Sequence, residues 1–404
     1  MVAENAPWPA HGGGLVRLAR IAGTMAEVTD LDLFFLHDAG RTDLAPPPGL
    51  RVGRWAGVPY PGASAPWRWR PGWALRRGTP LEVAMAANTG PRDALLRWAR
   101  PPYDVVWFST AAVFAWMGRP RLGPTIVDLM DLEDVKARLR ADLLVAGRVG
   151  RSRGDRFHIR LAAAQARRNA GDWQRLQRSV AAGVERVVVT SDVDAARSGL
   201  DNVSVVPNTY PAPDHPAGDP SVDRPPVVLF QGSLGYAPNI DAAEWLVEEV
   251  APRIRRLVPG VEVRLVGQAA SPVRRLHRAG SVTVVGRVAT MDRELATASV
   301  AAVPVRYGSG TRVKILESFA HRVPVVSTAV GAEGLDVTDG EHLLLADDPG
   351  SFADATVRLL RDPELRVRLT DAARRRYLER YAGPSASLAV RRLLDEVAAS
   401  RTRT

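Results

Sequence analysis

From residue 225 onward, short apolar runs alternate with segments in which apolar residues recur at helical spacing. The apolar runs predict buried strands at 227–230, 261–266, 282–285, 300–305, 324–328 and 343–346. After the first run, one predicted helix face carries Ala242, Trp245, Leu246, Val250, Ile254 and Leu257. Asp241 and Glu244 have the spacing of a capping box at the start of that helix. Strands that alternate with helices form parallel sheets, so residues 227–382 are predicted to be a doubly wound α/β domain.

The first half of the chain repeats this pattern less regularly. Strand-like runs occur at 31–37, 105–108, 125–128, 184–190 and 203–206. They predict a first Rossmann-like domain over residues 1–210, joined to the second by a linker at 211–226 that is rich in Pro and Asp. A final helix at 385–400 follows Gly383-Pro384 and can pack back on the first domain.

The amino-terminal segment Met1–Asn5 is shorter than the strand that should open the first domain. We therefore expect either a sheet that lacks most of a central strand or a start that lies upstream.

The amino-acid composition excludes several kinds of active site and metal site. The chain of 404 residues has no cysteine, which excludes disulfides, thiol nucleophiles and cysteine-ligated metals. Its seven histidines show no HExxH or paired spacing, so no histidine-based metal site is predicted. The fractions of hydrophobic residues, 46%, and charged residues, 24%, are those of a soluble globular protein. Without a long apolar run or a signal sequence, the chain is expected in the cytoplasm.

The net charge of +10 suggests an anionic partner, although an excess of arginine can also reflect base composition. The basic stretches 148–168 and 374–380 are interpreted first as solvated helix faces. Neither stretch has the interleaved aromatic residues typical of single-strand nucleic-acid binding.

The segment 300–330 carries the strongest candidate site. An apolar run ends in Gly308, Ser309 and Gly310, and a helical pattern then begins at Thr311. Lys314 and Glu317 lie three residues apart on one side of that helix. Amides at a helix start and a nearby cation favour a phosphate at the carboxyl edge of a parallel sheet. Taken alone, a glycine turn beside a solvated ion pair explains the pattern equally well.

Five motifs in order resemble the GT-B glycosyltransferases, and family 4 in particular. They are the proline and double glycine of Pro9 to Arg17, the Pro207-Asn208 turn, the GSLGYAPN segment at 232–239, the Gly286-Arg287-Val288 turn, and the block from Gly308 to Thr328. This resemblance covers most of the chain. It implies two Rossmann-like domains that face each other across a cleft.

The resemblance also implies an activity: transfer of a sugar from a nucleoside-diphosphate sugar to an acceptor hydroxyl, with retention of configuration. Arg312 and Lys314 would neutralise the diphosphate and Glu317 would bind the ribose. Other donor contacts would come from Gly13, Gly14, Gly232, Ser233, Arg287, Val288, Gly308, Ser309, Gly310 and Thr311. Arg17, Trp67 and Trp69 are assigned to the acceptor side. No cofactor, metal or nucleic acid is expected, and the acceptor is a glycan, a lipid-linked sugar or a small molecule.

Two departures from the family limit these assignments. Many members carry two glutamates separated by seven residues, and here Ser309 occupies the earlier position. A neutral hydroxyl cannot support a developing positive charge as a carboxylate does, so the sugar is not specified. The arginine and lysine that many members carry after the first strand of the second domain are absent from residues 234–239.

Three other classes of protein were compared with this interpretation. A Rossmann dehydrogenase is disfavoured because Gly12-Gly13-Gly14 is not GxGxxG. A metal-dependent GT-A enzyme could use Asp192-Val193-Asp194, Asp30-Leu31-Asp32 or the spaced Asp128, Asp131 and Asp134, but helix capping explains them more simply.

The third class is a basic membrane- or nucleic-acid-binding protein with a non-catalytic GT-B fold. A cluster of tryptophans and arginines fits peripheral contact with the inner face of a membrane, although a proline-rich surface loop is favoured slightly. The cluster comprises Trp55, Trp67, Trp69, Trp73, Arg54, Arg68, Arg70, Arg76 and Arg77.

Overall fold

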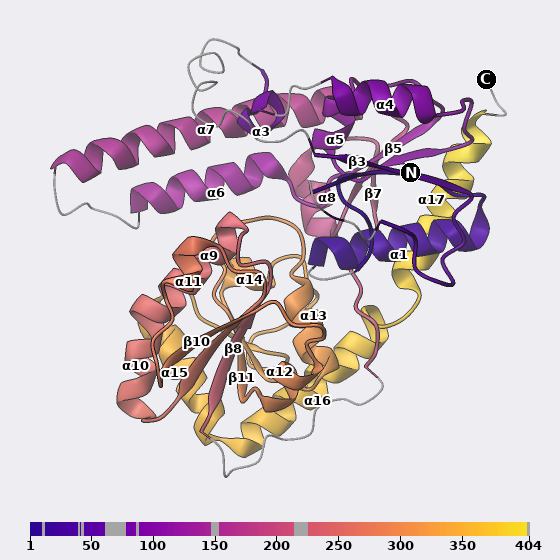
Figure 1. Ribbon diagram of the computed structural model, residues 1–404. Coiled ribbons are helices and arrows are strands. Elements are labelled where there is room, and N and C mark those ends of the chain that lie inside the picture. The colour runs from indigo at the N-terminus through magenta and orange to yellow at the C-terminus, as the bar shows by residue number, and fades with distance from the viewer. Residues whose placement is uncertain are drawn as a thin grey trace. The chain divides into compact units, whose positions relative to one another are not determined.

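The computed structural model describes residues 1–9, 13–38, 41, 44–60, 78–85, 89–146, 153–213 and 225–401. The chain forms two compact units, which are described separately (Figure 1). The first comprises Met1–Pro207, Gly308–Gly310 and Ala386–Thr404, and the second comprises Asn208–Tyr307 and Thr311–Ser385.

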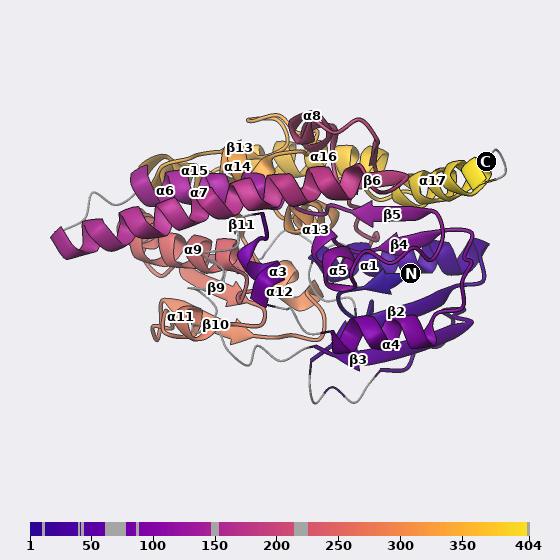
Figure 2. The same cartoon turned by 90° about the horizontal axis from the view of Figure 1, so that it is seen from above.

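The first unit is built on a parallel sheet of seven described strands, in the order β3-β2-β1-β4-β5-β6-β7. Figure 2 shows several of these strands in succession across the sheet. Their bounds are β1 Val2–Ala3, β2 Asp32–His37, β3 Arg54–Pro59, β4 Val106–Phe108, β5 Thr125–Asp128, β6 Arg186–Val189 and β7 Val203–Val205. The described helices are α1 Gly13–Val28, α3 Leu81–Met85, α4 Gly90–Trp98, α5 Ala111–Trp116, α6 Glu133–Ala146, α7 Arg153–Ala181, α8 Asp192–Ser198 and α17 Ser385–Arg401.

Strand β2 shows how the first sheet separates two cores. Leu33 and Phe35 belong to a cluster that includes buried residues of α1 and α17. Phe34 and Leu36 belong to another cluster, formed with α5 and the carboxyl-terminal half of α7. Successive side chains of a strand point to opposite faces, so this apolar run has helices on both sides.

Helix α17 covers part of α1 within the first unit. Leu18, Ile21 and Met25 of α1 share a buried cluster with Val390 and Leu393 of α17. Thr24 donates a hydrogen bond of 2.9 Å to Ser387, and Arg391 pairs with Glu27 at 2.7 Å. The last helix of the chain thus completes the core of the first unit.

The second unit contains a parallel sheet of six described strands in the order β10-β9-β8-β11-β12-β13. The strands are β8 Val227–Gln231, β9 Glu262–Val266, β10 Val282–Gly286, β11 Val300–Val303, β12 Val325–Ser327 and β13 Leu344–Leu345. The described helices are α9 Ala237–Trp245, the π-helical turn η1 Leu246–Val250, α10 Ala251–Leu257, α11 Ser271–Arg274, α12 Asp292–Thr297, α13 Val313–Ala320, α14 Ala329–Ala332, α15 Pro349–Arg361 and α16 Pro363–Arg380.

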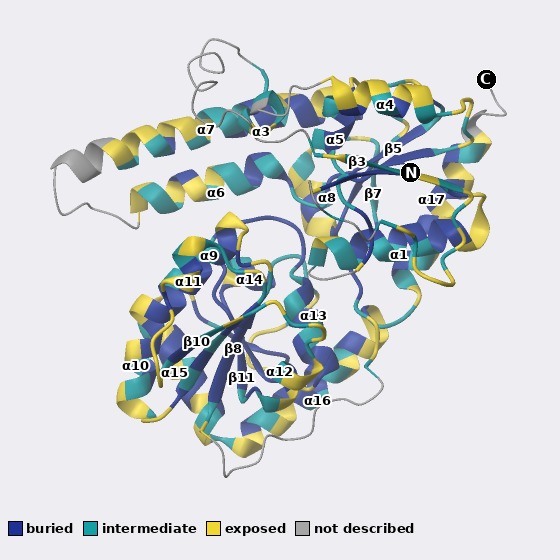
Figure 3. Cartoon of the chain, in the orientation of Figure 1, coloured by how far each residue is buried: buried dark blue, intermediate teal, exposed yellow. Residues whose placement is uncertain are grey.

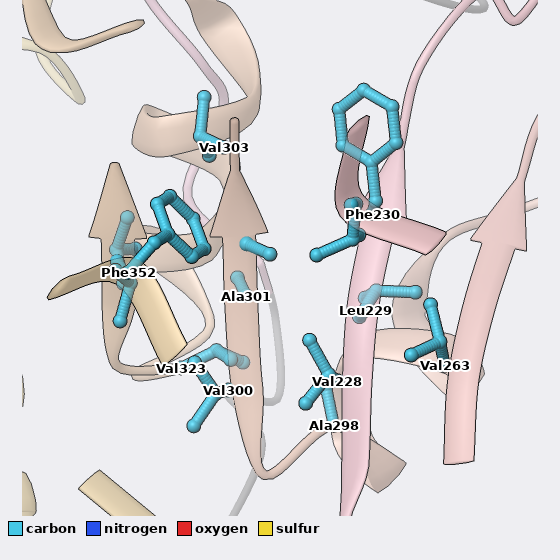
Figure 4. Close-up of a cluster of buried hydrophobic side chains, with 14 of the residues drawn as sticks. Val228, Leu229, Phe230, Val263, Ala298, Val300, Ala301, Val303, Val323 and Phe352 are labelled. Carbon is cyan, nitrogen blue, oxygen red and sulfur yellow. The ribbon is translucent and has the colours of Figure 1, made fainter. Parts of the chain in front are cut away.

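The core of the second unit surrounds its two central strands. Val228 and Leu229 of β8 lie beside Val300 and Ala301 of β11, with Phe352 of α15 packed against the same cluster (Figure 4). The predicted fold class, α/β with two parallel-sheet units, is confirmed by the two sheets.

The central strand of the first sheet is the two-residue β1, which pairs with both β2 and β4. The sheet thus lacks most of that strand, which agrees with one of the two alternatives expected from the sequence. Three other local predictions are corrected by the structure. Arg54 and Trp55 do not belong to a surface loop, because they lie in strand β3. Their segment was hard to recognise because it is an edge strand that contains glycine and is bounded by proline.

The predicted start of the first helix of the second unit is also wrong. Helix α9 begins at Ala237 with Pro238 in its first turn, so Asp241 and Glu244 lie inside the helix and form no capping box. Asp241 instead accepts two hydrogen bonds from Arg306, at 2.7 and 3.0 Å. Leu257, predicted on the buried face, is 45% exposed at the end of α10.

Candidate functional site

The candidate site lies where the strand order of the second sheet changes direction. The chain runs outward from β8 through β9 to β10, returns to the centre, and continues from β11 to β13. The carboxyl ends of the adjacent strands β8 and β11 lead into Gly232 and Arg306 respectively. Ligands of open parallel sheets bind at such a switch point.

Helix α13 follows β11 and brings its polar residues to the end of β8. Its apolar residues Ile315, Leu316 and Phe319 are buried, while Lys314 and Glu317 are partly buried. Gln231 at the end of β8 lies with its amide nitrogen 3.4 Å from the Lys314 carbonyl oxygen and 3.5 Å from the Glu317 carboxylate. The helix therefore supplies a cation and an anion to the same edge of the sheet.

Lys314 is held by groups of α9 and β8. Its ammonium donates a hydrogen bond of 2.9 Å to Asn239 and lies 4.2 Å from the centre of the Phe230 ring. Burial lowers the pKa of Lys314 to about 7, and the nearby Arg312 adds to this effect while Glu317 opposes it. Because Lys314 is bonded to Asn239, the arrangement is not that of a solvated pair between Lys314 and Glu317.

Gly232 leaves room for the lysine. A Cβ atom at this position would lie 3.0 Å from the Lys314 nitrogen and 3.2 Å from the Asn239 amide. The φ angle of Gly232, 145°, is also one that other residues rarely adopt. The glycine predicted from the sequence thus has a steric reason in this site.

Glu317 has partners of its own, Tyr210 and Gln231. Burial raises the pKa of Glu317 to about 7, whereas hydrogen bonding to Tyr210 and Gln231 lowers it. The pKa of Tyr210 is raised by burial and by the carboxylate beside it. Tyr210 is fixed in turn, because the Tyr377 hydroxyl donates to its carbonyl at 3.0 Å.

The turn before α13 is closely packed. Gly308 and Gly310 have φ angles of 143° and 72°, which explains the two glycines. These residues and the fully buried Ser309 group with the first unit, where the Ser309 hydroxyl donates to the Leu132 carbonyl at 3.2 Å. Thr311 groups with the second unit, and Asn208 donates to its hydroxyl at 2.8 Å and to its carbonyl at 3.2 Å.

The other predicted donor residues are more dispersed. Ser233 is exposed, and its carbonyl accepts a hydrogen bond of 2.9 Å from Asn239. Arg287 is exposed beyond the end of β10, an edge strand separated from β8 by β9, and Val288 packs partly against the core. The structure therefore brings Gly232, Lys314 and Glu317 together and places Arg287 and Val288 at a different strand end.

Of the predicted site residues in the amino-terminal part of the first unit, the structure describes Gly13, Gly14 and Arg17. Gly13 and Gly14 are the first residues of α1. Arg17 is buried, bonded to both carboxylate oxygens of Asp128 at 2.9 and 3.1 Å and to the Val206 carbonyl at 2.7 Å. Trp67 and Trp69, assigned to the acceptor side, lie outside the described residues.

A polar group at the carboxyl edge of the first sheet was not predicted from the sequence. Glu4 follows β1 and accepts a hydrogen bond of 2.7 Å from the hydroxyl of Tyr60, which follows β3. The Glu4 amide donates to Ser109, which follows β4, at 2.8 Å. Burial raises the pKa of Glu4, while Tyr60 and Lys136 lower it. Such groups can bind hydroxyls, but they lie after three separate strands and no sequence motif links them.

The aspartates that suggested a metal site have other roles in the structure. Ser191 is the N-cap of α8 and accepts from the Asp194 amide at 3.1 Å. Asp128 pairs with Arg17, and Asp131 lies 3.6 Å from Lys136. In the described part of the chain, no group of three His, Asp or Glu residues could hold a metal ion.

The part of the chain that contains Gly232, Lys314 and Glu317 matches a known protein family. Residues 225–362 match the family model for glycosyl transferases of group 1. An uncharacterised 44.6 kDa protein of the cps region of Klebsiella pneumoniae is 27% identical over 135 residues, which are 31% of this chain. The chain spans about a third of that relative's length, 35%.

Solved structures match the fold of nearly the whole chain. Sucrose-phosphate synthase from Thermosynechococcus elongatus has a TM-score of 0.69 at 18% identity and covers 99% of both chains. WaaG, a glycosyltransferase of lipopolysaccharide biosynthesis, has a TM-score of 0.62 at 14% identity over 96% of this chain and 98% of its own. HepE from Anabaena, solved with UDP and glucose, has a TM-score of 0.60 at 14% identity over 98% of both chains. The predicted GT-B fold is thereby confirmed.

Proposed function

We propose that this protein transfers a sugar from a nucleoside-diphosphate sugar to a hydroxyl group of an acceptor. The observation that carries the proposal is the convergence of Gly232, Lys314 and Glu317 at the switch point of the second sheet, inside the segment that matches group 1 glycosyl transferases. The solved neighbour that contains UDP and glucose supports a nucleotide-sugar donor.

In this proposal, α13 and the residues before it hold the diphosphate. The amides at the start of the helix and the Arg312 and Lys314 side chains offer positive charge to the leaving group. In the free protein, the Lys314 ammonium readily loses its proton near neutral pH because its pKa is about 7. A bound diphosphate raises that pKa, so the lysine becomes charged where the negative charge develops.

Glu317 is proposed to accept hydrogen bonds from the ribose hydroxyls, and Tyr210 and Gln231 hold its carboxylate in place. The backbone around Arg287 and Val288 is proposed to contact the base. Gly13 and Gly14, at the start of α1, would offer amides to the diphosphate or the acceptor.

Retention of the anomeric configuration is proposed by attack on the face of the leaving group, with the departing phosphate as the base. This route needs no side-chain nucleophile, and none is assigned. No metal is assigned a role, so turnover should survive treatment with EDTA.

The acceptor is proposed to be a glycan, a lipid-linked sugar or a small molecule, and the reaction to be cytoplasmic, with peripheral contact to the inner membrane face. No helix in the described ranges is long and apolar enough to cross a membrane.

A donor screen tests this function directly. Release of nucleoside diphosphate is measured from UDP-, GDP-, ADP- and dTDP-sugars, with and without candidate acceptors. We expect Lys314→Ala and Glu317→Ala each to lower kcat/KM by about 10- to 100-fold, the value of one hydrogen bond to a charged group.

Arg375→Ala, on the exposed side of α16, serves as the matched control and should leave turnover unchanged. Near-normal turnover in Lys314→Ala and Glu317→Ala would refute the donor site, and no released diphosphate from any donor would refute the activity.

A further inference from the structure

The first sheet has a switch point of its own, between strands β1 and β4. The chain runs outward from β1 through β2 to β3, returns to the centre, and continues from β4 to β7. The ends of the two central strands are joined, because the Ser109 amide donates to the Val2 carbonyl at 3.0 Å and the Glu4 amide donates to the Ser109 hydroxyl at 2.8 Å. Ligands of open parallel sheets bind at such a point, so Glu4 lies where a ligand is expected.

The Glu4 carboxylate has one oxygen that can accept a hydrogen bond from a ligand. Its Oε1 atom accepts a hydrogen bond of 2.7 Å from the Tyr60 hydroxyl, while Oε2 forms no hydrogen bond with the described residues. Burial raises the pKa of Tyr60, and the charges of Glu4 and Asp38 raise it further, so this hydroxyl stays a donor. Glu4 and Tyr60 are both partly exposed, so solvent and ligands can reach them.

The charges around Glu4 are mainly negative. Lys136 lowers the pKa of Glu4, yet this lysine already pairs with Glu133 at 2.6 Å and lies 3.6 Å from Asp131. Burial raises the pKa of Glu133, and the charges of Asp131 and Glu82 raise it further. Within the described ranges, Lys136 is the one cation that shifts the pKa of Glu4 or Glu133.

Helix α6 holds Glu133 and Lys136 near this edge of the sheet with its first turns. Their side chains are 28% and 17% exposed, whereas the last residues of the helix are exposed (Figure 3). Asp134 and Val135, between them, are buried, and Asp134 accepts a hydrogen bond of 3.0 Å from Gln177 of α7. Packing therefore fixes the part of α6 that carries the ion pair.

We propose that Glu4, Tyr60, Glu133 and Lys136 form a subsite for the acceptor, and that this subsite takes an uncharged sugar ring. Ionised carboxylates accept hydrogen bonds from hydroxyl groups, and a sugar ring carries several such donors. A phosphate or carboxylate on that ring would instead meet like charges, while Lys136 is already paired. The inference rests on the proposed glycosyl transfer, because it gives the bound sugar the role of the acceptor.

Binding of sugars to the full-length chain tests the subsite without turnover. Ligand-observed NMR is recorded with and without UDP for methyl glucoside, methyl mannoside and methyl galactoside, for their octyl analogues, and for glucose phosphate and mannose phosphate. We expect the neutral glycosides to bind at least about tenfold more tightly than the sugar phosphates, since like charges brought together cost binding energy. Tighter binding of the octyl glycosides would identify a lipid-linked sugar as the source of the ring, and equal binding the end of a glycan.

Glu4→Gln removes the negative charge and keeps the shape of the side chain. We expect it to weaken binding of the neutral glycosides by about 10- to 100-fold, the value of one hydrogen bond to a charged group. Glu27→Gln makes the same change on the exposed side of α1 in the same unit. It removes a surface ion pair with Arg391, so it should bind the glycosides as the wild type does.

Tyr60→Phe tests whether Tyr60 orients and charges Glu4. Tyr60 lowers the pKa of Glu4, so its loss should raise that pKa, and binding of the neutral glycosides should decline at a higher pH than in the wild type. Lys136 also lowers this pKa and remains in the variant. Tyr103→Phe removes a hydroxyl that donates to Asp32 at 3.0 Å, at the start of β2 and so at the opposite edge of the sheet. It should leave the pH dependence unchanged.

Three results would overturn the proposal: no binding of any neutral glycoside to the wild type, equally tight binding of the sugar phosphates, or equal binding by Glu4→Gln and Glu27→Gln. The outcomes separate this inference from the proposed transfer. Sugar transfer that does not depend on Glu4 would refute the subsite alone. Sugar binding that depends on Glu4, together with a failed donor screen, would keep the sugar site and refute the transfer.

Discussion

Lys314 and Glu317 lie three residues apart on α13, and burial moves their pKa values toward each other, to about 7 in each case. Near neutral pH, each group can therefore change its protonation when a charged ligand binds. A ligand that presents negative charge to Lys314 and hydroxyls to Glu317 favours the charged form of each. Binding of a nucleotide sugar is then coupled to proton transfer.

The sign of this coupling can be predicted. At about pH 8, Lys314 is mostly neutral and Glu317 mostly ionised, so nucleotide-sugar binding should take up close to one proton through Lys314. At about pH 6, Lys314 is already charged and Glu317 mostly protonated, so binding should release a proton. Calorimetry with UDP-glucose in buffers of different ionisation enthalpy measures both quantities.

Lys314→Met provides the matched variant for this measurement. It removes the titrating amine and keeps much of the chain volume, so proton uptake at the higher pH should disappear while release at the lower pH remains. Unchanged uptake in Lys314→Met would show that another group carries the proton.

Tyr210 should influence the donor site through Glu317. Its hydrogen bond lowers the pKa of Glu317, so Tyr210→Phe should raise that pKa and shift the acidic limb of kcat/KM for the donor to higher pH. Gln231 and Lys314 also lower this pKa, while Asp292 raises it, and all three remain in the variant.

Tyr377→Phe is the control for Tyr210→Phe. It removes the hydroxyl that donates to the Tyr210 carbonyl, yet it leaves the Tyr210 hydroxyl in place. We expect the acidic limb of the kcat/KM pH profile of Tyr377→Phe to match that of the wild type. An identical pH shift in both variants would indicate a general loosening of the tyrosine cluster.

Sequence patterns identified the site residues that belong to a local motif. They did not identify the residues that reach the site only through contacts between distant parts of the chain. Gly232, Lys314 and Glu317 stand out by spacing and by resemblance to a family. Tyr210 lies more than 100 positions before Glu317, and only the fold shows that its hydroxyl meets that carboxylate. Asn239 was visible as part of a motif, but its bond to Lys314 was not.

Among the elements, α17 has the clearest energetic role because it covers the apolar face of α1. Leu393 is 3% exposed in this contact, and Leu388 on the same helix is 56% exposed. Leu393→Ala should lower the free energy of unfolding by about 2–5 kcal/mol, the usual cost of a buried leucine.

Leu388→Ala makes the same chemical change on the exposed side of α17 and should alter stability by about 0.5 kcal/mol or less. Urea denaturation of both variants measures the difference. Equal effects would show that α17 contributes helical propensity alone and not burial.

Most elements could be predicted because a parallel strand buried on both faces is a continuous apolar run. Strand β3 was missed because its residues are only half-buried or exposed and include Gly57 between Trp55 and Val58. The π-helical turn between α9 and α10 was missed too, since it keeps the same apolar positions buried as a regular helix would.

The two units of the molecule have unequal shares of tryptophan. Nine of its ten tryptophans precede residue 208, and Trp245 alone belongs to the second unit. Trp245 is buried against Phe352, and the Arg306 guanidinium lies 5.5 Å from its ring. Fluorescence of a Trp245→Phe variant therefore reports on the first unit.

A nucleotide that binds the second unit should stabilise that unit. At about 100 times its dissociation constant, UDP should raise the free energy of unfolding by about 2.7 kcal/mol. With UDP, we expect the part of the wild-type fluorescence unfolding curve that comes from Trp245 to shift toward higher stability. The fluorescence unfolding curve of Trp245→Phe should not change when UDP is added. Calorimetry must first show that the variant binds UDP.

Equal shifts in the two proteins would indicate that both units unfold in one cooperative step. Multidomain chains commonly depart from such two-state behaviour. The sequence predicted two domains from the alternation of strands and helices, and it left open how far the last helix contributes to the first of them.

The return of α17 to the first unit has a consequence for the order in which the protein is completed during synthesis. During synthesis, the residues of the second unit emerge from the ribosome before α17 does. Until then, Leu18, Ile21 and Met25 of α1 lack the apolar residues that cover them in the finished protein. The domain made first is therefore the one finished last, and a nascent chain stalled before residue 385 should expose this apolar face to chaperones.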